Sequence, residues 1–232
     1  MMNIPLFDCH CDTAAHAREH GEKLRRNRMQ LDLERLSHYS PAGQVFAVCA
    51  ADDAEPVKFA DATILYFLEQ IKENSDIVKL CLNFRDILSA EKEGKIAAML
   101  SIEGAEQISD IDAAYMQGVR IVHMTWNHDN ALCGAAMDSG AGLTQEGKRF
   151  VMRAQQLGII ARDYVVPHGI AVQHRDELLA RHHVLPHEVR GAVGQRCAAL
   201  HDAVVDCPLA SSFAPIAAVI VLKIFPHFAE QL

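Results

Sequence analysis

Short apolar runs alternate with amphipathic stretches through the first two thirds of this 232-residue chain. Five runs have the composition of buried parallel strands: residues 4–9, 45–50, 96–102, 119–124 and 159–160. Helical spacing lies between them at 59–71, at 110–117 and at 145–157, the last between Thr144 as N-cap and Gly158. This order predicts an α/β fold with a parallel sheet, either doubly wound or a (β/α) barrel.

Polar residues follow three of these strands at the carboxyl end, where barrel enzymes hold their catalytic groups. They are His10 and Asp12 after the first strand, Glu103 after the third, and Trp126 and Asn127 after the fourth. Because the carboxyl ends of parallel strands meet at one edge of a sheet, these side chains would face one mouth. The barrel is therefore favoured over the doubly wound sheet.

His10 and Asp12 have the spacing of a metal-ligand pair. Residues two apart in a strand point to the same face, and an imidazole nitrogen with a carboxylate oxygen suits zinc. The short motif alone is weak, because an aspartate there can simply cap a turn. Glu103 adds support, since a carboxylate that ends a buried strand is costly unless it is paired or bound to metal. An ion pair with a lysine or arginine, or exposure in the loop, is the alternative for Glu103.

Composition and charge narrow the class of protein. Half of the residues are hydrophobic, so the chain can bury a sizeable core. A net charge of -8 argues against nucleic acid as a partner. Seven irregularly spaced cysteines favour a reducing cytoplasm over a disulfide framework. The longest apolar run, 214–224, is too short to span a bilayer, so we expect no membrane partner.

The pattern changes after residue 161. Prolines are scattered through the remainder, which holds seven of the thirteen histidines, and no clear alternation of strands and helices continues. A βαβ unit takes roughly 30 residues, so this remainder is too short to complete eight units. We therefore expect a barrel that is incomplete after the fifth strand, formed by residues 1–161, and a divergent segment, 162–232, that is non-native or poorly folded.

Several segments, in order, carry a family resemblance. Residues 7–13 (FDCHCDT) match a DxHxD opening, 30–36 (QLDLERL) match QxDLxxL, 101–104 (SIEG) match a strand with a bridging glutamate, and 118–130 match the following strand and loop. Together they resemble the membrane (renal) dipeptidase family, the M19 metallopeptidases. The resemblance covers about residues 4–161.

The resemblance implies a TIM-like barrel with two zinc ions that hydrolyses dipeptides through metal-activated water. His10 and Asp12 would bind one ion, Glu103 would bridge both as the catalytic carboxylate, and Trp126 and Asn127 would shape the substrate mouth. Two histidines from later strands would complete the second site. The family also implies a homodimer, and with it the sequence predicts a cytoplasmic zinc-dependent dipeptidase acting on small dipeptides.

One departure from the family leaves alternatives open. The family has an Asp-x-Ser-His segment after the strand at 159–160, whereas this chain reads ARDYVVPH, which places His168 about three residues late. The chain would then hold one zinc ion or none, and activity would be lost. Two rivals remain: a non-catalytic remnant that binds at most one ion, and a metal-dependent amidohydrolase of another substrate class. The latter group usually opens with HxH, where this chain has Asp12 in the second position.

Overall fold

The computed structural model describes residues 4–51 and 53–162, which fall within one compact unit, Met1–Pro167. Predictions for later residues, including the poorly folded segment and the role of His168, lie outside the described residues. The predicted domain boundary after residue 161 stays a prediction for the same reason.

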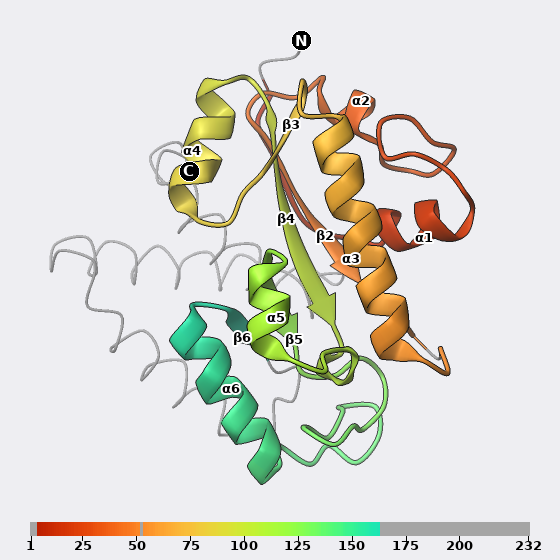
Figure 1. The fold of residues 1–232 in the computed structure, drawn as a ribbon, viewed down its shortest axis with the longest axis vertical. Helices are drawn as coiled ribbons and strands as arrows, with labels where there is room; N and C mark the ends of the chain where they lie inside the picture. The colour runs from red at the N-terminus through yellow and green to blue at the C-terminus, as the bar shows by residue number, and fades with distance from the viewer. Residues whose placement is uncertain (1–3, 52, 163–232) are drawn as a thin grey trace, which may run out of the picture. The chain divides into compact units, whose positions relative to one another are not determined.

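The described strands form one parallel sheet of six (Figure 1). They are β1 (Leu6–Cys11), β2 (Ala42–Val48), β3 (Val78–Leu80), β4 (Ile96–Glu103), β5 (Val119–His123) and β6 (Ile160–Arg162). The order along the sheet is β1-β2-β4-β5-β6, with β3 paired to β4 outside this path. Every residue of β2 is buried, and so is every residue of β4 except Glu103 at its end. These two strands are the centre of the described sheet.

The edge of β4 that faces away from β2 is shared by two strands. β3 pairs with its amino-terminal part, from Val78 beside Ile96 to Leu80 beside Ala98. β5 pairs with its carboxyl-terminal part and sets Glu103 beside His123. The strand beside the carboxyl-terminal end of β4, where Glu103 lies, is therefore β5, the next strand in the chain.

Four of the six described helices begin at a residue whose side chain caps the first backbone N–H groups. The six are α1 (Thr13–Glu19), α2 (Leu33–Leu36), α3 (Pro56–Glu73), α4 (Phe84–Lys92), α5 (Ile111–Met116) and α6 (Gln145–Leu157), with a 3-10 turn at Ala105–Gln107. Asp110 accepts hydrogen bonds from the first backbone N–H groups of α5. Thr144 caps α6, which ends at Gly158 in the left-handed conformation, φ +84°. The predicted helices at α3, α5 and α6 are confirmed.

Helices α3, α5 and α6 pack on one face of the sheet (Figure 1). A single apolar cluster joins Phe46, Leu100 and Val122 of the strands to helix residues such as Phe67 and Ala154. Figure 1 shows α3, α5 and α6 on the same side of the strands. Alternate strand residues point the other way, as the period of two requires. Among residues 4–51 and 53–162, the helices of this cluster lie on one face, which is the layer arrangement of a (β/α) barrel, whereas a doubly wound sheet has helices on both faces. The predicted α/β class is confirmed.

Besides the short helices α1 and α2, two neighbouring elements were not predicted, β3 and α4. β3 has three residues, and Lys79 at its centre interrupts the apolar run. α4 buries only Ile87 and Ala90, which is too little to produce a clear helical period. With β3 included, the strand at 160–162 is the sixth rather than the fifth.

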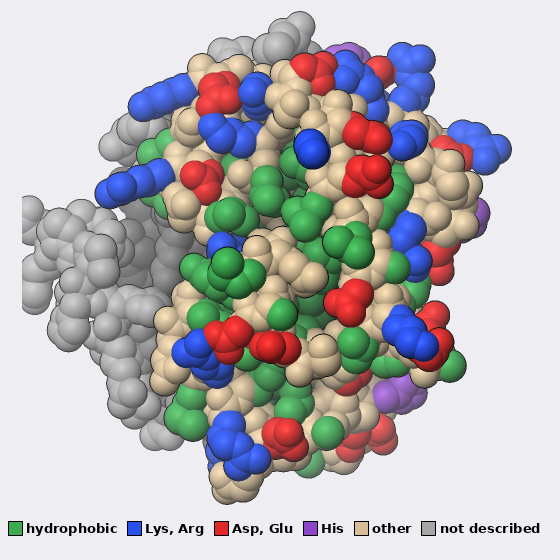
Figure 2. Space-filling model, viewed as in Figure 1, with side chains coloured by type: hydrophobic (Ala, Val, Ile, Leu, Met, Phe, Trp, Pro, Cys, Tyr) green, Lys and Arg blue, Asp and Glu red, His purple; other side chains and the backbone are tan. Residues whose placement is uncertain are grey.

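The outer helix surfaces carry charges of both signs with hydrophobic side chains between them (Figure 2). Leu65 of α3 and Met116 of α5 are 62% and 81% exposed. Among the described residues, no helix has the length and apolar content needed to cross a membrane.

Replacing Thr144 with alanine is expected to lower the free energy of unfolding by about 1 to 2 kcal/mol. The Thr144 hydroxyl accepts a hydrogen bond from the Gly147 N–H at 3.0 Å and donates one to the Ala131 carbonyl at 2.9 Å. Both would be lost. Thr144→Ser retains the hydroxyl and is the control in denaturant titrations of the two variants. Equal stability of Thr144→Ala and wild type would show that the cap contributes nothing.

Asp32 is expected to make stability depend on pH in the acid range. Burial raises the pKa of this carboxyl, but the hydrogen bonds and charge of Arg35 outweigh it, so the pKa lies below the ordinary 3.8. The contribution of ionised Asp32 to the free energy of unfolding is complete at pH values above 3.8 and is lost as the pH falls through the lowered pKa. The stability difference between wild type and Asp32→Asn, measured by denaturant unfolding, should therefore shrink between about pH 7 and about pH 2. A constant difference would contradict this.

Candidate metal centre

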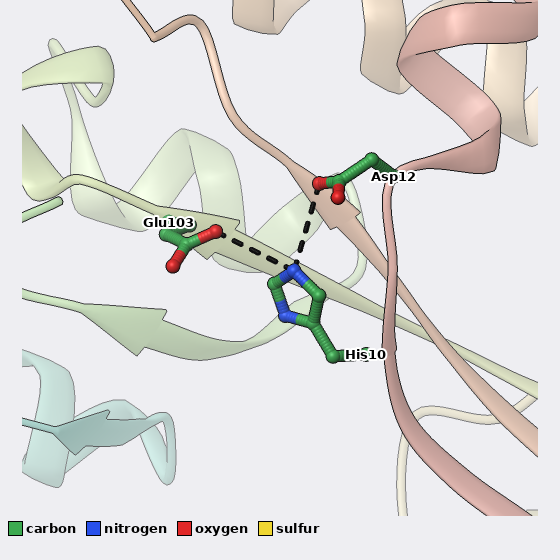
Figure 3. A group of neighbouring side chains, drawn as sticks. All are labelled: His10, Asp12 and Glu103. Carbon is green, nitrogen blue, oxygen red and sulfur yellow. Dashed lines mark ion pairs between the residues drawn. The ribbon is translucent and has the colours of Figure 1, made fainter. Parts of the chain in front are cut away.

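Two strand ends bring together His10, Asp12 and Glu103 (Figure 3). His10 is the penultimate residue of β1, and Asp12 follows that strand at the N-cap position of α1. Glu103 is the last residue of β4. Because β1 and β4 lie on opposite edges of β2, the three side chains meet across the carboxyl end of β2.

The imidazole of His10 lies between the two carboxylates. Its Nε2 atom is 3.5 Å from Oδ1 of Asp12 and 3.4 Å from Oε2 of Glu103. One ligand atom from each residue lies within 4.8 Å of the other two. Donors bound about 2.0–2.1 Å from a tetrahedral zinc ion stand roughly 3.4 Å apart. The two distances to His10 therefore match the spacing of ligands around one ion.

The charges in this cluster are unbalanced. The contact with Asp12 raises the pKa of His10 against the opposing effect of burial, and the same contact lowers the pKa of Asp12. Burial raises the pKa of Glu103, whose side chain is 16% exposed. Among residues 4–51 and 53–161, no lysine or arginine forms an ion pair with any of the three. The donor set, one imidazole nitrogen and two carboxylates around a shared space, fits a divalent cation.

Cys49, the first residue after β2, does not have the properties of a nucleophile. Burial, followed by the negative charges of Glu103 and Asp12, raises the pKa of its thiol to about 12. The thiol is then protonated at neutral pH, whereas cysteine catalysis requires the thiolate.

Trp126 and Asn127 lie in the loop after β5, and both are partly buried. Neither forms a hydrogen bond or an ion pair with His10, Asp12 or Glu103. The structure thus brings together three of the five predicted site residues. A role for the other two in substrate binding stays a prediction.

His123 belongs to this region and was missed. Its side chain is 8% exposed, and its Nδ1 atom is 4.0 Å from Oε1 of Glu103. Its ring is nearly parallel to that of His10, with an interplanar angle of 11° and centroids 6.3 Å apart. Like Glu103, it is a polar residue that ends a buried apolar strand. It lies within the predicted strand 119–124, and the signal that identified Glu103 applies to it equally.

Comparisons with known proteins identify the family of this chain. The family model of the membrane dipeptidases, peptidase family M19, matches residues 1–162. Dipeptidase ataJ of Aspergillus terreus is 26% identical over 124 residues, which are 47% of this chain and 30% of that protein. The chain spans less than a third of the length of the curated relatives it matches.

Two solved structures share the fold. Dipeptidase AC, a metallopeptidase of family M19, has a TM-score of 0.60 and 23% identity over 69% of this chain and 56% of that one. A metallopeptidase from Rhodobacter sphaeroides, liganded with a phosphinate mimic of the dipeptide L-Ala-D-Ala, has a TM-score of 0.59 and 23% identity over 69% of this chain and 58% of its own. With the family match over residues 1–162, the predicted resemblance is confirmed: this chain belongs to the membrane dipeptidase family, peptidase family M19.

Proposed function

We propose that this chain carries the metal centre of a zinc-dependent dipeptidase, with His10, Asp12 and Glu103 as ligands. The observation that carries the proposal is the convergence of three donor atoms from the ends of β1 and β4. Oε2 of Glu103 lies 3.4 Å and Oδ1 of Asp12 lies 3.5 Å from Nε2 of His10. Family membership supplies the substrate class, since relatives are named as dipeptidases.

Each residue has a distinct part in this proposal. His10 lies between the two carboxylates and supplies the nitrogen donor. Glu103, the more buried carboxylate, faces the cluster from the end of the central strand, and Asp12, 45% exposed, lies at its solvent side. A bound divalent ion would polarise the scissile carbonyl and lower the pKa of a water molecule. Trp126 and Asn127 would border the bound dipeptide from the loop after β5.

Three further predictions belong to this proposal. The family resemblance predicts two zinc ions and a homodimer. The cysteine content predicts a cytoplasmic location. Within residues 4–51 and 53–161, the donors form one three-residue group. A chain that relies on this group alone would bind one ion.

Removal of metal is expected to abolish dipeptide hydrolysis reversibly. Zinc would be counted per chain in the purified full-length protein by elemental analysis, and turnover of a dipeptide panel would be measured before chelation, after chelation and after zinc is restored. His38→Ala, an exposed histidine before β2, is the matched control and should behave as wild type. Two ions with turnover would indicate a complete dinuclear centre. One ion without turnover would support the remnant, and no bound zinc would refute the proposal.

A further inference from the structure

Glu103 has a different imidazole beside each of its two carboxylate oxygens. Oε2 is 3.4 Å from Nε2 of His10, and Oε1 is 4.0 Å from Nδ1 of His123. The two rings are nearly parallel. The carboxylate is thus flanked on both sides, once by a proposed ligand and once by a residue that the proposed ligand set does not include.

The backbone fixes this arrangement. Glu103 and His123 are directly paired across β4 and β5, so their side chains point to the same face of the sheet. Both are the last residues of their strands, and the His123 side chain is 8% exposed. A side chain held this closely has few other orientations, because burial in a packed interior restricts its rotamers.

The distances separate a ligand from a supporting residue. Ligands of one tetrahedral zinc ion stand roughly 3.4 Å apart, and both distances to His10 agree with this. The 4.0 Å between His123 and Glu103 is longer. An imidazole beside the outer oxygen of a ligating carboxylate is typical of the residues that orient ligands.

We propose that His123 is a positioning residue, which holds the Glu103 carboxylate in the orientation that metal binding requires and so sets the affinity of the site. This inference rests on the proposed metal centre and extends it by one residue. It acts through Glu103, so the number of bound ions does not depend on it.

The test compares zinc affinity and stoichiometry, by calorimetric titration, in full-length His123→Ala, His123→Asn and the control His38→Ala. His123→Ala should bind the same number of ions about 10- to 100-fold more weakly. His123→Asn should recover most of the affinity, because the asparagine amide nitrogen occupies a position close to that of Nδ1. An unchanged affinity in His123→Ala would overturn the proposal, and so would the loss of one bound ion, which would make His123 a ligand.

A second measurement, on metal-free protein, separates this proposal from the metal centre itself. Unfolding midpoints would be compared for Glu103→Gln, His123→Ala and the double variant. If the two residues contact each other, the effects of the two single substitutions on the unfolding midpoint should not add up in the double variant. Additive effects would overturn the positioning role even where zinc binds. Failure of the wild type to bind zinc would refute the metal centre instead. The comparison of the single and double variants would still show whether Glu103 and His123 interact.

Discussion

Replacing Glu103 with glutamine is expected to lower dipeptide turnover about a thousandfold, which corresponds to roughly 4 kcal/mol of transition-state stabilisation. Glutamine has the same shape but no negative charge, so it would fill the place beside His10 without supplying an anionic ligand. The direction of the pKa shift adds a second expectation. Because burial raises the pKa of Glu103, the charged carboxylate is not stabilised by its surroundings in the metal-free protein.

Glu103→Gln should therefore lose turnover and zinc, while the unfolding midpoint of the metal-free variant stays at or above that of metal-free wild type. Turnover and bound zinc would be measured on one preparation, and denaturant unfolding on the same preparation after chelation, because bound zinc itself stabilises the folded state. Glu91→Gln, the same change at an exposed position of α4, should leave all three unchanged. Full activity of Glu103→Gln would exclude Glu103 from the catalytic machinery.

The largest expected loss of stability follows from Phe67→Ala, at about 3 to 5 kcal/mol. Phe67 is completely buried on α3, and its ring lies 5.2 Å from that of Phe46 on β2, tilted by 48°. The substitution removes this aromatic contact and leaves a cavity between helix and sheet.

Denaturant unfolding measures this loss, and Leu65→Ala on the same helix is the control. Leu65 is 62% exposed, so its truncation should change the free energy of unfolding by about 0.5 kcal/mol or less. Similar losses in the two variants would mean that the contact between α3 and β2 is not the centre of the apolar core.

Local signals were sufficient for much of the fold. The caps at Asp110, Thr144 and Gly158 act on backbone groups a few residues away, so the limits of α5 and α6 follow from the sequence itself. β3 did not follow, because its pairing with residues 96–98 depends on partners distant in the chain, and three residues around Lys79 have no clear pattern.

The candidate site divides in the same way. The convergence of His10, Asp12 and Glu103 was predictable, because the carboxyl ends of parallel strands meet at one edge. The contact of Glu103 with His123 was not, because it depends on the register between β4 and β5, and a shift by one residue would turn His123 to the other face.

The shared edge of β4 also bears on how such a chain can vary in evolution. β3 pairs with residues 96–98, whereas β5 pairs with 100–103, where Glu103 lies. An insertion or deletion between β3 and β4 changes a connection at the amino-terminal end of the strand, and surface connections tolerate changes of length. The pairing of Glu103 with His123 lies at the opposite end. A change in the length of that connection would thus leave Glu103 and His123 in place.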